Sequence, residues 1–250
     1  MPQWVMAGGA GLMAGGALLL GSVIAWLVSV PTRVVAAVMA FGSGVLISAL
    51  AFELVQEAAE QGGLIATAAG FLVGSVVYVG LNVLLARYGA RHRKRSGNQQ
   101  PSQEDQAGSG GAIAIGALLD GIPESMVLGL SLLTGSGVSV AMFAAVFISN
   151  VPEGLSSTAG WKKAGRSRGY VFGIWTGIAV ISGIAALAGY LLLDGAPPAT
   201  LAFVNALAAG AILAMITDTM IPEAFESAAM YSGLIATLGF LAAFSLHRLG

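Results

Sequence analysis

Residues 118–129 read LLDGIPESMVLG, with two carboxylates and a proline in the middle of an otherwise apolar stretch. A second proline–glutamate pair follows in FISNVPEG, residues 147–154. Aligned without a gap, the two motifs place Asp120 over Ser149 and Glu124 over Glu153. A four-residue spacing puts the two polar side chains of each motif on one face of a helix. The pattern therefore predicts two helices with matched polar faces.

The chain around these motifs has the composition of an integral membrane protein. Of its 250 residues, 56% are hydrophobic and only 9% are charged, whereas a soluble domain has about 25% charged residues. The mean hydropathy is +0.85. A membrane-spanning helix needs about 20 mostly apolar residues. Windows of this kind recur at Val5–Val28, Val34–Leu54, Leu64–Ala86, Ala112–Thr134, Val138–Gly160, Val171–Leu193, Leu201–Thr219 and Ser232–Leu246. We expect an all-α polytopic membrane protein with eight transmembrane helices, forming one transmembrane domain over residues 1–250.

One long polar stretch interrupts the apolar windows, and its composition predicts a disordered loop at about residues 88–110. With eight crossings, this loop shares one side of the membrane with nearly all other basic residues. By the positive-inside rule that side is cytoplasmic, so both termini lie outside. The expected location is the cell membrane, as a multi-pass protein of the bacterial inner-membrane type. The absence of cysteine excludes disulfides and thiolate ligands.

Two pairs of segments repeat in the same order. The stretch GSGVLISALAFELVQEA from Gly42 aligns without a gap with AAGAILAMITDTMIPEA from Ala208, and GLIATAAGF from Gly63 matches GLIATLGF from Gly233. Because the second and seventh windows run in opposite directions across the membrane, the repeat is inverted, as in many secondary transporters. Helices one to three are expected to mirror helices six to eight around the central fourth and fifth.

The carboxylates of the central pair need a partner. At about 1.5 Å per residue, Asp120 lies roughly 12 to 15 Å into its helix, near the middle of a hydrocarbon core about 30 Å thick. Each proline frees the carbonyl four residues earlier, and no lysine, arginine or histidine lies within the two segments. Protonation of a lone glutamate is the simpler alternative, but paired motifs favour a divalent metal ion from solution. The candidate metal ligands are Asp120, Glu124, Ser149, Asn150 and Glu153.

The arrangement resembles the ZIP (Zrt/Irt-like) family of divalent metal transporters over nearly the whole chain. The segments AFELVQEA (51–58) and TDTMIPEA (217–224) are similar to acidic helices of that family as well. The resemblance implies transport of zinc, or of iron- or manganese-type ions, towards the cytoplasm by a homodimer, with no cofactor besides the transported ion. The family's two metal-site glutamates fall on Glu124 and Glu153. Its two histidines fall on Asp120 and Ser149, and the neighbouring polar positions on Gly121 and Asn150.

This sequence departs from the family pattern at several ligand positions. Both metal-site histidines are replaced, and Val180 stands roughly where many bacterial relatives place a further glutamate. The loop holds His92 but no histidine-rich tract. Because zinc favours nitrogen and sulfur ligands, a preference for zinc and a binuclear centre are both less expected here.

Further acidic residues fall at the predicted ends of the pore. Glu53 and Glu57 lie at the outer end of the second helix, and Asp218 and Glu223 at the inner end of the seventh. Such pairs can draw cations towards a pore. An ordinary solvated helix end is the alternative reading, and it is preferred for Glu57.

Other functions were weighed against transport. A metal- or proton-binding membrane sensor or scaffold, derived from a transporter but without transport activity, is the alternative. An intramembrane protease is disfavoured because the serines near the Pro-Glu motifs have no histidine or lysine within the membrane segments. The chain is therefore not expected to be an enzyme. Its expected partners are divalent metal ions and the lipid bilayer, not nucleic acid.

Overall fold

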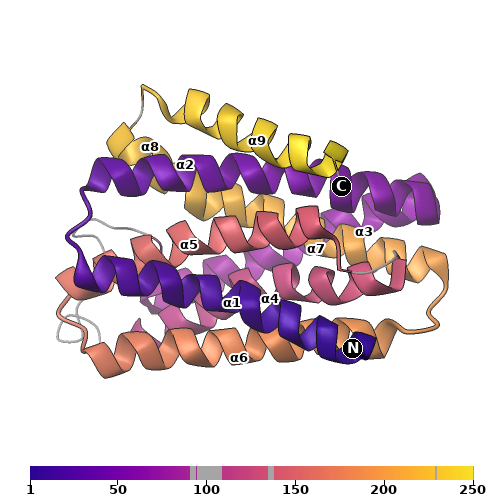
Figure 1. The fold of residues 1–250 in the computed structure, drawn as a ribbon, viewed down its shortest axis with the longest axis horizontal. Helices are drawn as coiled ribbons and strands as arrows, with labels where there is room; N and C mark the ends of the chain where they lie inside the picture. Colours follow the sequence, from indigo (N-terminus) through magenta and orange to yellow (C-terminus); the bar gives the residue numbers. More distant parts are fainter. Residues whose placement is uncertain (91–93, 95–108, 135–137, 229, 250) are drawn as a thin grey trace.

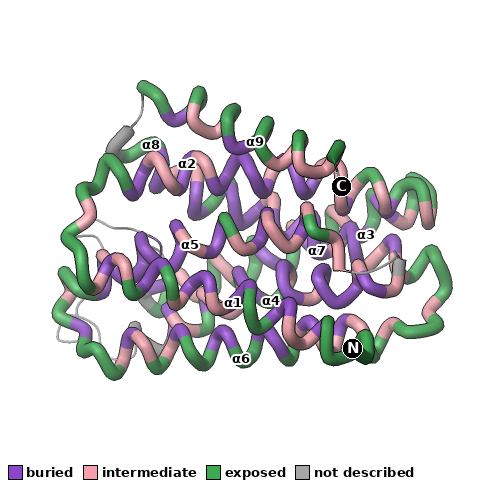
Figure 2. Tube along the Cα trace, viewed as in Figure 1, coloured by how far each residue is buried: buried purple, intermediate pink, exposed green. Residues whose placement is uncertain are grey.

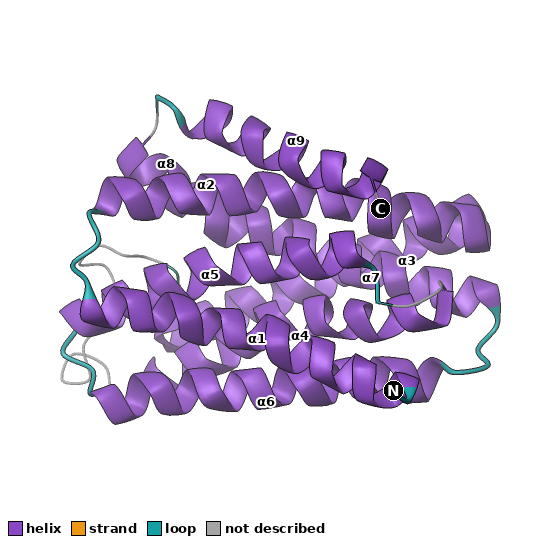
Figure 3. Ribbon diagram, viewed as in Figure 1, coloured by secondary structure: helices purple, strands orange, loops and turns teal. Residues whose placement is uncertain are grey.

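The computed structural model describes residues 1–90, 94, 109–134, 138–228 and 230–249. Within this part of the chain all regular structure is helical and no strand occurs (Figure 3). The helices lie side by side and run roughly along the long axis of the molecule (Figure 1). In chain order, with η marking π-helical segments, they are α1 (Gln3–Leu27), α2 (Thr32–Ala49), η1 (Leu50–Val55), α3 (Gln56–Leu85), η2 (Ala86–Ala90), α4 (Ser109–Thr134), α5 (Val140–Lys163), α6 (Arg168–Leu193), α7 (Pro198–Met215), η3 (Ile216–Met220), α8 (Ile221–Ala228) and α9 (Ser232–Leu249).

Seven helices in the described residues are long and apolar enough to cross a bilayer. This agrees with the predicted all-α polytopic membrane protein, for which eight crossings were expected. The longest runs from Thr32 to Tyr88 over 57 residues and contains two of the predicted windows. A straight helix of that length would measure about 85 Å, nearly three times the hydrocarbon thickness. It is not straight, because Gly63 interrupts it with φ 76° and ψ 173°. This positive φ is readily adopted only by glycine. It divides the segment into residues 32–62, which contain α2, η1 and the first turns of α3, and residues 64–88, which contain the rest of α3.

Glycines bring two pairs of helices into backbone contact. A Cβ atom added at Gly44 of α2 would lie 1.8 Å from the carbonyl oxygen of Ala236 in α9. One added at Gly210 of α7 would lie 1.9 Å from the carbonyl oxygen of Phe71 in α3. No side chain fits at either crossing, so the absence of a Cβ lets the backbones approach as small residues do in membrane helix pairs.

The two π-helical segments η1 and η3 continue α2 and α7, respectively. A π turn accommodates an extra residue in the helix and rotates the residues that follow to a different face. The ungapped alignment of the two halves pairs Leu50 with Ile216, which are the first residues of η1 and η3. The helix therefore changes face at paired positions in both halves.

Buried side chains concentrate on the inner helices, whereas α9 lies at the periphery (Figure 2). In α5, residues from Ser149 to Trp161 are mostly buried, but in α9 only Ser232 and Gly239 are. The apolar outer surface of α9 is what a lipid-facing helix requires.

The ends of the predicted cytoplasmic loop are more helical than expected. The π-helical segment η2 extends through Ala90, and α4 begins at Ser109. Residues 91–93 and 95–108, including His92, lie outside the described residues, whereas Lys94 is described and buried.

Candidate cation-binding site

The central carboxylates lie on α4 and α5, each of which contains an internal proline at position 123 or 152. Asp120, Glu124 and Glu153 are exposed by only 2%, 1% and 4%, respectively. Asp120 and Glu124 are four residues apart and share the buried face of α4, whereas Ile122 between them is 37% exposed. Three acidic side chains are thus removed from solvent in the interior of a helical membrane protein.

Lys94 provides a cation for two of these carboxylates. Its Nζ atom lies 2.6 Å from Oε1 of Glu153 and 3.3 Å from Oδ2 of Asp120. The three side chains are 1–6% exposed, so this is a buried ion pair with two acceptors. Because neither helix contains a basic residue, the sequence predicted that a cation or protons from solution would be the partners of these carboxylates. The structure adds a partner from the chain itself, Lys94, which lies in the polar stretch between α3 and α4.

Tyr78 of α3 is a second partner that the sequence argument missed. Its hydroxyl donates a hydrogen bond of 2.6 Å to Oδ1 of Asp120, and the ring is 1% exposed. Asp120 is therefore held from both sides, by the tyrosine hydroxyl at one oxygen and by Lys94 at the other. A buried tyrosine usually satisfies its hydroxyl in this way. The only indication of this contact in the sequence is a single tyrosine inside an apolar window.

Glu124 is less well satisfied than its neighbours. Its carboxylate lies within electrostatic range of Glu153, Lys94 and Asp120. Among the described residues, its buried Oε1 atom has no hydrogen-bond partner. Such an atom is costly in a low-dielectric interior, and it marks the place in the cluster where a further cation or proton is needed.

Ser149 and Asn150 are buried, but they donate hydrogen bonds to main-chain carbonyls and not to the carboxylates. The Ser149 hydroxyl donates to the carbonyl of Val146 in its own helix at 2.9 Å. The Asn150 side-chain amide donates to the carbonyl of Ala14 in α1 at 2.8 Å. The structure thus brings together Asp120, Glu124 and Glu153, while the other two predicted ligands make helix contacts.

Among the described residues, no three histidine, cysteine or acidic side chains are close enough together to hold one metal ion. Lys94 accounts for part of this arrangement, because its ammonium stands between the carboxylates of Asp120 and Glu153. A metal ion bound by these ligands requires a different arrangement of the cluster from the one described.

Glu223, predicted at the inner pore mouth, is 3% exposed and packs against α5. The Ser156 hydroxyl lies 3.1 Å from Oε1 of Glu223 and also donates to the main-chain carbonyl of Lys94. Ser156 follows Glu153 by three residues on the same face of α5. A polar row therefore continues from the carboxylate cluster to α8.

Asp218, by contrast, is exposed and accepts a hydrogen bond of 3.0 Å from the Asn82 amide. The residues predicted at the outer mouth line a small pocket with Ser139 and Asn205. Ser139 donates to Oε2 of Glu53 at 2.8 Å, and His247 contacts the other oxygen of this carboxylate. Glu57 accepts a bond of 2.8 Å from Gln61, one turn later in the same helix.

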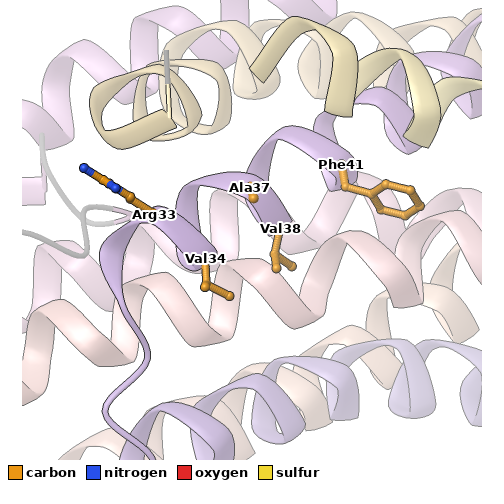
Figure 4. Close-up of a pocket in the computed structure, with 5 residues that line it drawn as sticks. All are labelled: Arg33, Val34, Ala37, Val38 and Phe41. Atoms are coloured by element: carbon orange, nitrogen blue, oxygen red, sulfur yellow. The ribbon is translucent and has the colours of Figure 1, made fainter. Parts of the chain in front are cut away.

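A second pocket runs along α2 and is lined by Arg33, Val34, Ala37, Val38 and Phe41 (Figure 4). Its lining contains no carboxylate, and its one charged residue, Arg33, would repel a cation. The carboxylate cluster is the better candidate for function.

Comparison with known protein families finds no family that matches this chain, and no curated protein matches it. The candidate site therefore rests on the residues and geometry above.

Proposed function

We propose that this protein carries divalent metal cations across the membrane, towards the cytoplasm, by means of the carboxylates on α4 and α5. The observation that supports the proposal most strongly is the burial of three acidic side chains, those of Asp120, Glu124 and Glu153, at one place in the interior. Among the described residues, Oε1 of Glu124 has no hydrogen-bond partner. A buried acidic oxygen needs a proton or a cation as its partner.

The proposed path crosses the membrane within eight helices. The break at Gly63 supports two crossings in the 57-residue segment. Figure 1 shows the two termini towards the same end of the molecule, as an even number of crossings requires. The paired π-helical segments and the paired contacts of Gly44 and Gly210 support an inverted repeat of helices one to three and six to eight.

The proposed orientation in the membrane follows from where the basic residues lie, and transport towards the cytoplasm is what the resemblance to the ZIP family implies. The α1–α2 and α5–α6 connections lie at the end opposite the termini (Figure 1). Basic residues gather near these connections and at the end of α3. They are Arg33, Arg87, Lys162, Lys163, Arg166 and Arg168. By the positive-inside rule this end is cytoplasmic.

The chemistry of the cluster favours hard divalent ions. All charged ligand atoms of the cluster are carboxylate oxygens. Manganese, magnesium and iron(II) bind oxygen ligands more favourably than sulfur ligands. Zinc still binds many oxygen sites because of its higher intrinsic affinity. The resemblance to the ZIP family, carried by the two Pro-Glu motifs, supports the same substrate class.

A metal- or proton-binding sensor or scaffold without transport is the second candidate. Lys94 favours it, because an internal ammonium partly neutralises the cluster without any ion from solution. Protein that binds metal but does not move it would support this candidate.

Uptake of radiolabelled manganese or zinc into proteoliposomes tests the proposal. Glu124→Gln and Glu153→Gln keep side-chain size but remove a charge, so initial uptake should fall at least about tenfold, or about 1.4 kcal/mol. Glu60→Gln is the matched control, because this exposed carboxylate only accepts a bond from Gln56 of its own helix. Normal uptake by both site variants at normal reconstitution would refute the assignment.

A further inference from the structure

We propose that Lys94 is a built-in competitor for the cation site, whose ammonium group occupies the carboxylates until a divalent ion displaces it. This inference rests on the proposed function, since it concerns how the same site is filled. It assigns a role to a residue outside the helices that form the site.

The ammonium group of Lys94 contacts carboxylates on both helices of the proposed site. Lys94 Nζ lies 2.6 Å from Glu153 on α5 and 3.3 Å from Asp120 on α4. It thus joins the two helices that supply the proposed ligands, as a bound metal ion would. Its side chain is 4% exposed, although a lysine in a polar loop would ordinarily keep its charge in water.

A metal ion and this ammonium group exclude one another. Carboxylate oxygens bind divalent metals at about 2.0 to 2.6 Å, so an ion shared by Asp120 and Glu153 would lie where the ammonium lies. Two positive charges at that separation repel strongly in a low-dielectric interior.

The main chain of Lys94 is held as well as its side chain. Its carbonyl accepts a hydrogen bond from the Ser156 hydroxyl, which also contacts Glu223. The lysine is therefore presented to the cluster from a defined position, and its covalent tether gives it a high effective concentration there.

This competition predicts discrimination by charge. A monovalent ion that replaces the ammonium gains no additional Coulomb attraction, and it must also overcome the effective concentration of the tethered lysine. A divalent ion gains twice the attraction to the same carboxylates. Sodium and potassium should accordingly fail to displace Lys94 at concentrations at which manganese or zinc succeeds.

Chemical labelling of amines on the purified full-length protein measures the displacement directly. The sequence holds three lysines, at positions 94, 162 and 163, and Lys162 is exposed. Without metal, acetylation of Lys94 should be at least about tenfold slower than that of Lys162, because burial protects it. Saturating manganese should accelerate labelling of Lys94 at least about fivefold and leave Lys162 unchanged, whereas sodium at the same ionic strength should not.

Binding of radiolabelled manganese to Lys94 variants supplies a second measurement. Lys94→Gln removes the competitor and should tighten apparent manganese affinity at least about tenfold. Lys94→Arg keeps a positive charge and should leave the affinity within about threefold of the wild type. Lys162→Gln makes the same chemical change outside the site and should have no effect. Monodisperse elution in detergent verifies that each variant is folded.

The outcomes separate this inference from the proposed function. If manganese binds the wild type without accelerating Lys94 labelling, and Lys94→Gln binds no more tightly, the competitor role is refuted while metal binding stands. If only Lys94→Gln binds metal, Lys94 blocks the site permanently, so both displacement by a divalent ion and the proposed transport function are refuted. If neither protein binds manganese or zinc, the proposed function fails and this inference fails with it.

Discussion

The carboxylate cluster on α4 and α5 and the outer pocket near η1 use similar chemical groups in different surroundings. Each places a carboxylate beside a hydroxyl and a basic side chain. In the cluster, the side chains of Lys94, Asp120 and Glu153 are 1–6% exposed. In the outer pocket, His247 is 30% and Glu53 is 13% exposed.

The difference in burial changes what the charges do. A buried ion pair stabilises little by itself, but removal of one partner leaves a charge that the interior cannot solvate. An exposed pair contributes about 0–1 kcal/mol, because water replaces either partner. The same residue types should therefore be structurally essential in the cluster and dispensable in the outer pocket.

The largest contrast is expected from alanine substitutions of the two glutamates. Glu153→Ala should lower the free energy of unfolding by about 3 kcal/mol, the low end for a broken buried pair, because Lys94 keeps Asp120 as a partner. Glu53→Ala should cost less than about 1 kcal/mol. Unfolding in mixed micelles measures both, and equal losses would contradict the distinction.

A double-mutant cycle sharpens this result. Adding Lys94→Gln to Glu153→Ala removes the ammonium group that the first substitution leaves poorly compensated. The double variant should therefore lose less unfolding free energy than the sum of the losses in the two single variants.

Two tyrosines test the same contrast with identical chemistry. Tyr78→Phe removes the hydrogen bond to the buried Asp120 carboxylate and should cost about 2 kcal/mol of unfolding free energy. Tyr190→Phe removes an exposed bond of 2.9 Å to Gln3 and should cost no more than about 0.5 kcal/mol. A costly Tyr190→Phe or a neutral Tyr78→Phe would show that burial is not the deciding variable.

Transport should show a smaller effect in the outer pocket than in the cluster. Glu57 lines the outer pocket and accepts a hydrogen bond from Gln61 of its own helix, so Glu57→Gln should lower initial manganese uptake by no more than about threefold. The Glu124→Gln assay described above is the reference. A tenfold loss in Glu57→Gln would place a binding step in the outer pocket.

The smallest effect is expected at His247. Replacement by glutamine removes a partly exposed partner of Glu53 and should change the unfolding free energy by about 0.5 kcal/mol or less. When the imidazole is protonated the contact is an ion pair, and screening should then reduce even this difference as salt rises from about 0.05 to 1 M. A loss that resists salt would mean that the pair is shielded from solvent.

Hydropathy predicts much of this fold but not the composition of its site. Apolar windows of the right length fix where helices form, and the four-residue spacing fixes that Asp120 and Glu124 share a face. Periodicity gives no information about Lys94, which lies in a polar stretch and reaches the cluster only through tertiary structure.

The positions of Asn150 and Glu223 were equally inaccessible from the sequence. Asn150 lies one residue after Ser149, and only the packing of α1 against α5 shows that its amide meets Ala14. Glu223 follows the π-helical segment η3, which rotates the residues after it. A regular helical count from α7 therefore assigns Glu223 to the wrong surroundings.

The backbone contacts at Gly44 and Gly210 have a consequence for which mutations the protein tolerates. Any Cβ at these crossings would meet a carbonyl oxygen of the neighbouring helix, so a saturation library selected for folded protein should retain only glycine there. At Gly16 and Gly80 an added Cβ meets no heavy atom within 4 Å, so alanine and larger apolar residues should survive. Glycines in similar apolar helices would thus show opposite tolerance to substitution. The positions that accept only glycine would identify which helices are in backbone contact, without any structural measurement.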